Sequence, residues 1–119
     1  MTPLKNAIYH NPRCRKSRET LALLHDQGFK PEIIEYLKTP PSESDLGEIC
    51  RLLDVRPKEI IRTKEALFKE LGLSLKDERS DAEWIAIMSR HPKLIERPIV
   101  VRSGKAALGR PPENVLDLF

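Results

Sequence analysis

The N-terminal third of the chain places one amphipathic stretch between two short apolar runs. Residues 5–9 predict a strand, which the Asn11-Pro12 pair turns into a loop because proline restricts the residue before it to extended geometry. Leucines and alanines then recur with helical spacing until Gly28, a residue that suits the position just after a helix. Residues 32–37 are β-branched and aromatic and predict a second strand. The order strand, helix, strand predicts a parallel βαβ unit.

The middle of the chain predicts several short helices. Ser42 is a suitable N-cap for a helix with apolar residues spaced i, i+3, i+4 and i+7, and Cys50 lies on that apolar face. We therefore expect Cys50 to pack in the core. Pro57 suits the first turn of a further short helix, and another helical stretch ends at Gly72. Together these segments predict a helical insertion over about residues 40–76.

The C-terminal part predicts a capped helix, a hairpin and a last helix. The sequence Ser-Asp-Ala-Glu at 80–83 is a capping box, and its helix closes near His91. Residues 99–101 are β-branched, and a turn at 103–105 joins them to a second apolar run, which predicts a β-hairpin. A last helix follows the Gly-Arg-Pro-Pro break at 109–112.

This order of elements predicts an α/β fold with a mixed four-stranded sheet flanked by helices, the hairpin supplying the antiparallel strands. The 119 residues fit a single domain over 1–119. A content of 39% hydrophobic and 33% charged residues is typical of a globular protein rather than of a disordered or membrane-embedded one. No apolar run is long enough to cross a bilayer and the N-terminus lacks a signal-peptide pattern, so we expect a cytoplasmic protein without a membrane partner.

Charge and cysteine usage narrow the possible functions. A net charge of +3 with interspersed acids and bases, and 5% aromatic residues, do not indicate nucleic-acid binding. The two cysteines, Cys14 and Cys50, do not form a disulfide framework. The chain has no Cys-X-X-Cys, no zinc-ligand spacing and no glycine-rich phosphate loop, so neither a metal nor a bound cofactor is expected.

Cys14 is the strongest candidate for chemistry. It lies between the first predicted strand and helix, where the helix dipole together with nearby cations can lower the pKa of a thiol from near 8.5 to roughly 3.5–7.5. His10 precedes it by four residues. The cations around it in sequence are Arg13, Arg15, Lys16 and Arg18. We interpret Cys14 as a nucleophile; the alternatives are a buried small hydrophobic residue, and for the cations a solvated face or a weak nucleic-acid patch.

Three arginines lie at the ends of predicted elements: Arg62, Arg97 and Arg110. A thiolate facing guanidinium groups makes chemical sense when an anion binds, and the planar, permanently charged fork of arginine fits a tetrahedral oxyanion. Because Lys and Arg together number 21, three arginines in loops are also expected from composition.

Three motifs resemble those of the glutaredoxin-linked arsenate reductases, the ArsC family. His10-Asn11-Pro12-X-Cys14 followed by Ser17-Arg18 resembles that family's active-site loop. The sequences IERPIVV at 95–101 and GRPPE at 109–113 resemble its two later signatures, and Leu-Gly-Leu at 71–73 after Arg62 also matches. The likeness spans almost the whole chain and implies a thioredoxin-like fold with a helical insertion. Arg15-Lys16 stand where the best-known members carry Gly-Thr, which is closer to a subgroup described as related to arsenate reductase.

The resemblance also implies roles by position. Cys14 would be the nucleophile. Three arginines would bind the oxyanion: Arg62, Arg97 and Arg110. Four residues would position or tune the thiolate and support its loop: His10, Asn11, Ser17 and Arg18. Thioredoxin-like folds carry a cis proline before the strand beside the active site, so we expect a cis Arg97–Pro98 bond, a geometry found in only about 5–6% of X–Pro bonds.

The implied activity is thiol-dependent reduction of arsenate to arsenite. The Cys14 thiolate would attack arsenic, glutathione as thiol co-substrate would attack the adduct, and glutaredoxin would recycle the product. The absence of a second cysteine near Cys14 agrees, because reduction then needs an external thiol. The expected partners are arsenate or a related oxyanion, glutathione and glutaredoxin, and the chain is expected to be a monomer.

Two other functions stay open. Cys14-Arg15-Lys16-Ser17 is a Cys-X-X-Ser, as in a monothiol, glutaredoxin-like thiol-disulfide oxidoreductase that would not need Arg62 or Arg110. A redox regulator that binds RNA polymerase is the non-enzymatic alternative, although such regulators typically switch through Cys-X-X-Cys. A phosphotyrosine phosphatase is disfavoured, because its Cys-X5-Arg would require arginine where this chain has Thr20.

Overall fold

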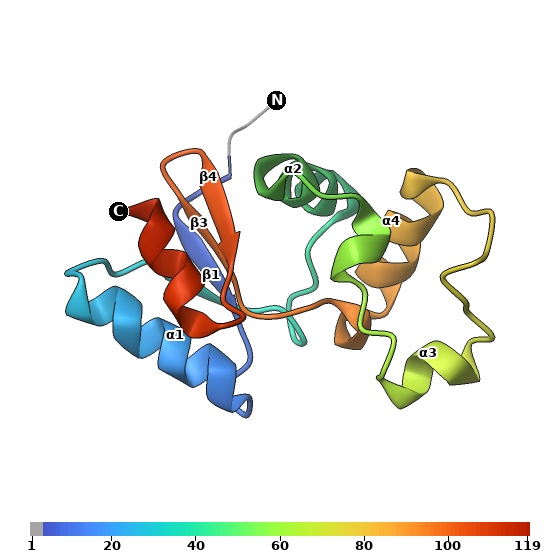
Figure 1. Ribbon diagram of the computed structural model, residues 1–119, viewed down its shortest axis with the longest axis horizontal. Coiled ribbons are helices and arrows are strands. Elements are labelled where there is room, and N and C mark those ends of the chain that lie inside the picture. The colour runs from blue at the N-terminus through green and yellow to red at the C-terminus, as the bar shows by residue number, and fades with distance from the viewer. Residues whose placement is uncertain (1–3) are drawn as a thin grey trace. The chain divides into compact units, whose positions relative to one another are not determined.

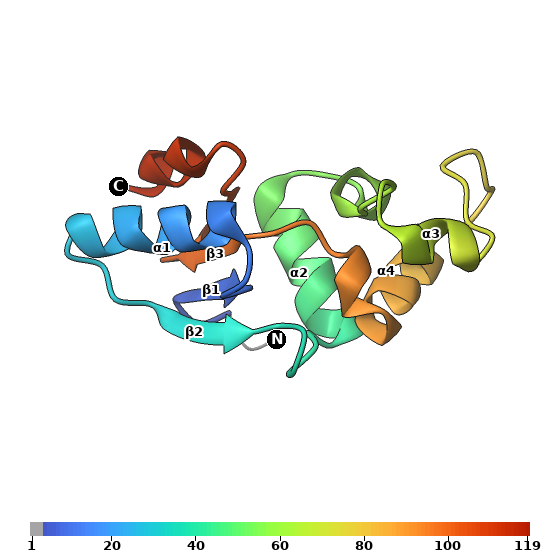
Figure 2. The same cartoon turned by 90° about the horizontal axis from the view of Figure 1, so that it is seen from below.

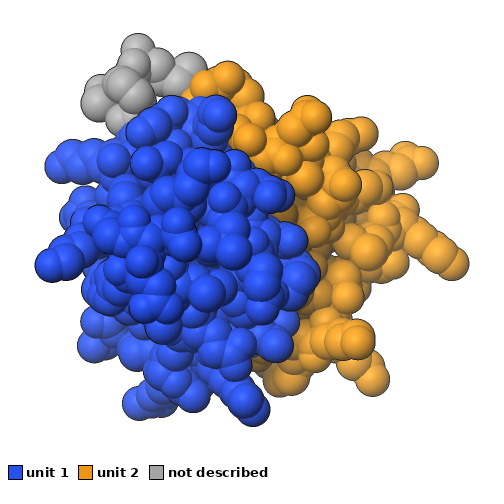
Figure 3. All heavy atoms as spheres, turned by 60° about the vertical axis from the view of Figure 1, so that its left-hand side comes forward, with its two compact units in different colours: residues 1–39, 97–119 blue, residues 40–96 orange. Residues whose placement is uncertain are grey.

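The computed structural model describes residues 4–119, whose contacts divide into two compact units (Figure 1, Figure 3). One unit joins the N-terminal part, up to residue 39, to residues 97–119, and the other comprises residues 40–96. The sequence placed the end of the helical insertion at about residue 76, whereas the second unit also contains the next helix. That the whole chain is a single domain stays a prediction.

The first unit is built on a mixed four-stranded sheet. Its strands are β1 (Ala7–His10), β2 (Glu32–Glu35), β3 (Ile99–Arg102) and β4 (Lys105–Leu108), in the order β2-β1-β3-β4. β1 runs parallel to β2 and antiparallel to β3, which pairs antiparallel with β4. The predicted fold class is confirmed.

Two helical segments cover one face of this sheet (Figure 2). They are α1 (Arg15–Asp26) and η3 (Pro112–Leu118). Together with β1 and β3 they bury one apolar cluster: Ile8, Leu24, Val100, Val115 and Leu118. The predicted last helix is present, and it is a 3-10 helix. Its turns close between residues three apart, as where the N–H of Asn114 donates to the carbonyl of Pro111 at 3.0 Å.

The register of the sheet gathers several loops at one end. His10 lies opposite Glu35 on β2, and Tyr9 lies opposite Ile99 on β3. Ile99 in turn lies opposite Leu108 on β4. The segments that follow β1, β2 and β4 and the segment that precedes β3 therefore meet at the same end, and this end carries most of the predicted site.

The second unit is helical, as predicted for most of it. Its elements are α2 (Glu43–Leu53), η1 (Pro57–Ile60), α3 (Ala66–Glu70), α4 (Asp81–Arg90) and η2 (Pro92–Leu94). The predicted caps are present: the Ser42 hydroxyl accepts from the N–H of Asp45 at 3.0 Å, and Ser80 with Glu83 forms the capping box of α4. Cys50 is buried, which raises the pKa of its thiol to about 11. Within residues 4–119 no helix combines the length and apolarity needed to span a bilayer.

Candidate active site

Cys14 occupies the N-cap position of α1, and its side chain is half-buried. Its own N–H donates to the carbonyl of Asn11 at 3.0 Å, and its carbonyl accepts the first helical bond from the N–H of Arg18, also at 3.0 Å. The Arg18 guanidinium reaches back to the carbonyl of Pro12 at 3.0 Å and so fixes the loop. This bond ties Arg18 to the loop, and the supporting role that the sequence resemblance implied for it stays a prediction.

The pKa of the Cys14 thiol lies below its ordinary value. Partial burial raises this pKa, but the backbone N–H of Ser17, the guanidinium of Arg97 and the backbone N–H of Lys16 favour the thiolate and outweigh burial. The N–H groups are those that a helix N-terminus leaves without intrahelical partners. The guanidinium of the neighbouring Arg15 is instead paired with Glu19 at 2.8 Å on the exposed side of α1.

His10, Ser17 and Asn11 form a hydrogen-bonded network below the loop. The N–H of Asn11 donates to Ser17 Oγ at 3.0 Å, and Ser17 Oγ lies 2.6 Å from His10 Nδ1. His10 is buried, and this burial lowers the pKa of its imidazole against the opposing effect of Glu35; Arg18 lowers it further. The direction of the bond between Ser17 and His10 follows the imidazole tautomer: with the ring proton on Nε2, Nδ1 accepts the hydroxyl proton of Ser17.

This burial makes His10 a source of pH-dependent stability. Because the folded pKa is lowered, the unfolded chain binds a proton first as pH falls, and the contribution of neutral His10 is present above about pH 6.5 and lost below it. The free energy of unfolding of His10→Gln should therefore fall less steeply than that of the unsubstituted protein between about pH 7 and pH 5. Urea titrations at each pH, with the exposed His25→Gln as control, measure this difference. If the free energy of unfolding fell equally steeply with pH in His10→Gln and in the unsubstituted protein, this role of His10 would be contradicted.

Two of the three predicted anion-binding arginines lie in the unit that contains Cys14. Arg97 precedes β3, and its bond to Pro98 is cis, the geometry that we expected from the family resemblance. Arg110 follows β4, and its Nε donates to the carbonyl of Arg97 at 2.9 Å. The bond from Arg110 to Pro111 is also cis, which the sequence did not predict.

Arg62 belongs to the other unit, residues 40–96. Its guanidinium pairs with Glu65 at 3.1 Å and donates to the carbonyl of Lys93 at 3.4 Å. Its backbone N–H donates to the carbonyl of Leu94 at 2.8 Å. The part of Arg62 in an oxyanion site stays a prediction.

Gly109 connects α1 with the cis-proline segment. Its N–H donates to the carbonyl of Pro98 at 2.9 Å. A Cβ at this position would come within 2.6 Å of Thr20 Oγ1 and 2.7 Å of Pro98 Cγ. The sequence alone did not single out Thr20 for this contact, because its partner lies almost ninety residues away along the chain. The Gly-Arg-Pro-Pro motif therefore contains a glycine for reasons of close packing.

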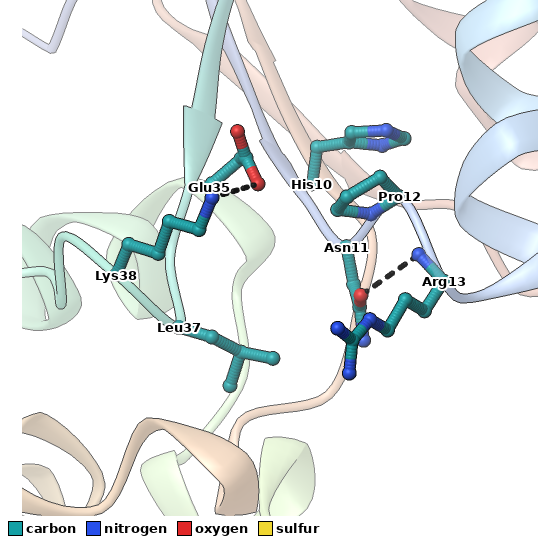
Figure 4. A pocket seen from close by; sticks show the side chains of 7 residues that line it. All are labelled: His10, Asn11, Pro12, Arg13, Glu35, Leu37 and Lys38. Carbon is teal, nitrogen blue, oxygen red and sulfur yellow. Dashed lines mark hydrogen bonds and ion pairs between the residues drawn. The ribbon is translucent and has the colours of Figure 1, made fainter.

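A pocket of about 440 Å³ opens beside the loop (Figure 4). Its lining residues come from the end of β1 and from the end of β2 with the turn after it: His10, Asn11, Pro12, Arg13, Glu35, Leu37 and Lys38. The sequence pattern indicates no function for Glu35, Leu37 or Lys38, since only the parallel pairing of β1 with β2 brings them here. Within residues 4–119 no three His, Cys, Asp or Glu side chains are grouped as a metal site would require.

Comparison with known protein families supports the resemblance of the motifs. The family model of ArsC matches residues 9–118, which include the Cys14 loop and both later signatures. The chain belongs to the ArsC family. The fold agrees: an ArsC-type structure, an arsenate reductase from Vibrio cholerae, superposes with a TM-score of 0.89 at 49% identity, over 98% of this chain and 100% of that one. The thioredoxin-like architecture implied by the motifs is confirmed.

Individual relatives of this ArsC-family chain cover almost its whole length. An arsenate reductase of Haemophilus influenzae is 49% identical over 115 residues, covering 94% of this chain and 97% of its own. A protein of Escherichia coli described as uncharacterized, YfgD, is 49% identical over 112 residues, or 93% of each chain.

Proposed function

We propose that this ArsC-family chain is an arsenate reductase with Cys14 as its nucleophile. The observation that carries the proposal is the environment of the Cys14 thiol. Its pKa is lowered at the N-terminus of α1 by backbone N–H groups and by the guanidinium of Arg97. A group that stabilises a thiolate can also hold a tetrahedral oxyanion next to it. Relatives named arsenate reductases, at close to half identity over nearly full length, support this choice of oxyanion.

The proposed reaction has two chemical steps at Cys14. The thiolate first attacks arsenic, an As–S bond forms, and one arsenate oxygen leaves as water after protonation. A thiol of glutathione then attacks the Cys14 sulfur, so that the S–S bond forms while the S–As bond breaks. The electron pair of that bond stays on arsenic, which leaves as arsenite, reduced by two electrons, while the two thiols become one disulfide. Glutaredoxin would remove glutathione from Cys14 by thiol-disulfide exchange, in a cytoplasmic setting.

In this mechanism the arginines and the loop network have different tasks. Arg97 would bind the anion, with Arg110 as a further ligand, and would stabilise the charge that develops as the adduct forms. Through Ser17 and Asn11, His10 would hold the loop in the conformation that aims the Cys14 sulfur. His10 and Ser17 are therefore proposed as positioning residues and not as groups that touch arsenate.

The proposal predicts how fast iodoacetamide alkylates Cys14 as a function of pH. In Arg97→Ala the alkylation profile should shift to higher pH, because the guanidinium no longer favours the thiolate, and protection by arsenate should weaken markedly. Arg15→Ala removes the same charge one residue from Cys14 and should behave like the unsubstituted protein, since Arg15 is paired with Glu19. The companion measurement is arsenite formation with glutathione and glutaredoxin.

A thiol that titrates near 8.5 and is not protected by arsenate would exclude the oxyanion reductase. Reduction of glutathione-mixed disulfides without arsenite formation would favour the monothiol oxidoreductase instead.

A further inference from the structure

The order of the strands gives the Cys14 loop two different sides. β1, which leads into the loop, lies between β2 and β3. Arg97 precedes β3 and acts on the Cys14 thiol from that side. On the β2 side lies the pocket of about 440 Å³, one wall of which is the segment Asn11-Pro12-Arg13 directly before Cys14. Arg97 and the pocket therefore lie on different sides of the loop that leads to Cys14.

Three charged side chains line this pocket: Arg13, Glu35 and Lys38. Figure 4 shows Glu35 and Lys38 on one wall and Arg13 on the other, with Leu37 directed between them. The turn that carries Lys38 is fixed, because the N–H groups of Lys38 and Thr39 both donate to the carbonyl of Glu35 at 2.9 Å. The pocket is thus a defined polar site with two cations and one anion.

The ion pair inside the pocket is of a kind that a ligand can replace. Lys38 Nζ lies 3.5 Å from Glu35 Oε1, and the two side chains are 78% and 41% exposed. A pair so exposed contributes little to stability because water competes for both partners. Lys38 and Glu35 can therefore exchange this ion pair for contacts with a ligand at a small cost in free energy. Leu37, 40% exposed, and Pro12 add apolar surface beside them.

We propose that this pocket binds glutathione and presents its thiol to Cys14. The inference rests on the proposed function and assigns a site to its co-substrate. Glutathione carries two carboxylates and one ammonium, the complement of Arg13, Lys38 and Glu35, while a bare oxyanion has no use for Glu35. The pocket volume lies within the range of about 300–1,000 Å³ typical of sites for small organic ligands.

The location also suits the second chemical step. A thiolate that displaces arsenic from sulfur must approach opposite the bond that breaks, with the reacting atoms aligned. With arsenic on the Arg97 side of Cys14, that approach comes from the β2 side, where the pocket lies. A thiol held in the pocket would thus reach Cys14 from the side away from Arg97, without displacing the oxyanion.

S-Methylglutathione tests the site without reaction, because its thioether cannot attack. Its binding is measured by NMR titration of the full chain and of two charge-reversed variants. Lys38→Glu should weaken binding about tenfold or more, the loss expected when a charge-assisted contact becomes a repulsion. Lys105→Glu is the matched control, because Lys105 begins β4 and pairs with Arg102 at the far end of the sheet.

The role of Glu35 is tested by changing the ligand, because Glu35 is expected to bind the ammonium group of glutathione. The analogue of S-methylglutathione that lacks the amino group should bind the unsubstituted protein more weakly than the parent compound, and this preference should disappear in Glu35→Gln. Failure of S-methylglutathione to bind, or equal weakening by Lys38→Glu and Lys105→Glu, overturns the assignment. Formation of arsenite by the unsubstituted protein with any thiol, including dithiothreitol, is measured separately. This measurement tests the proposed function and is independent of the glutathione site.

Discussion

Cys14→Ser should lose arsenate reduction by at least about a thousandfold, as expected when a covalent nucleophile is removed. A serine hydroxyl stays protonated at neutral pH, and its oxygen cannot take part in the S–S bond that accompanies the reduction of arsenic. The substitution should not unfold the chain, because Cys14 is an N-cap and serine is among the residues preferred there. Arsenite formation with glutathione and glutaredoxin measures the loss, and thermal unfolding of the variant checks the fold.

Cys50→Ala tests whether the loss of activity expected in Cys14→Ser is specific to Cys14 or follows from the loss of any thiol. Cys50 is buried in the other unit, and the pKa of its thiol is raised to about 11, so it is not expected to react. The variant should keep its activity while losing some stability. Substantial arsenite formation by Cys14→Ser would remove Cys14 from the mechanism.

Gly109→Ala should destabilise the chain by about 1–3 kcal/mol, the usual cost of forcing a methyl group into a packed interior. The new Cβ would lie 2.6 Å from Thr20 Oγ1 and 2.7 Å from Pro98 Cγ, so α1 and the segment before β3 would have to separate. Arg97 and Arg110 flank these contacts, and Arg110 Nε donates to the carbonyl of Arg97. Their displacement should lower arsenate affinity as well. Urea unfolding and protection of Cys14 by arsenate measure the two effects.

Gly47→Ala is the matched control for this effect, with the opposite sign expected. Gly47 lies within α2, and a Cβ there would meet only Ile85 Cδ1, at 3.9 Å, an ordinary contact. Alanine is favoured over glycine in a helix by about 0.8–1 kcal/mol, so this variant should be more stable than the unsubstituted protein. If both glycine substitutions changed stability alike, close packing at Gly109 would not be its cause.

Local patterns in the sequence were sufficient to predict most elements and to indicate Cys14 as the candidate nucleophile. The strand, loop and helix around Cys14 follow from a short apolar run, a proline and a helical stripe of leucines, each of which acts within a few residues. The N-caps Ser42 and Ser80 are likewise local. The resemblance of the motifs to the family predicted oxyanion-binding roles for the three arginines and a cis bond before Pro98. The last helix was correctly predicted to start at the Gly-Arg-Pro-Pro break, and it begins at Pro112 as a 3-10 helix.

Contacts between distant segments decided the rest. The structure shows that Arg97, and not the exposed Arg15, acts on the Cys14 thiol, and that Gly109 packs against Thr20. The pocket with Glu35 and Lys38 exists because β1 and β2 pair in parallel, with His10 opposite Glu35. Periodicity records which face of an element is apolar, but it holds no information on which neighbour covers that face. Register and packing supply that information, and with it the pocket that we propose for glutathione.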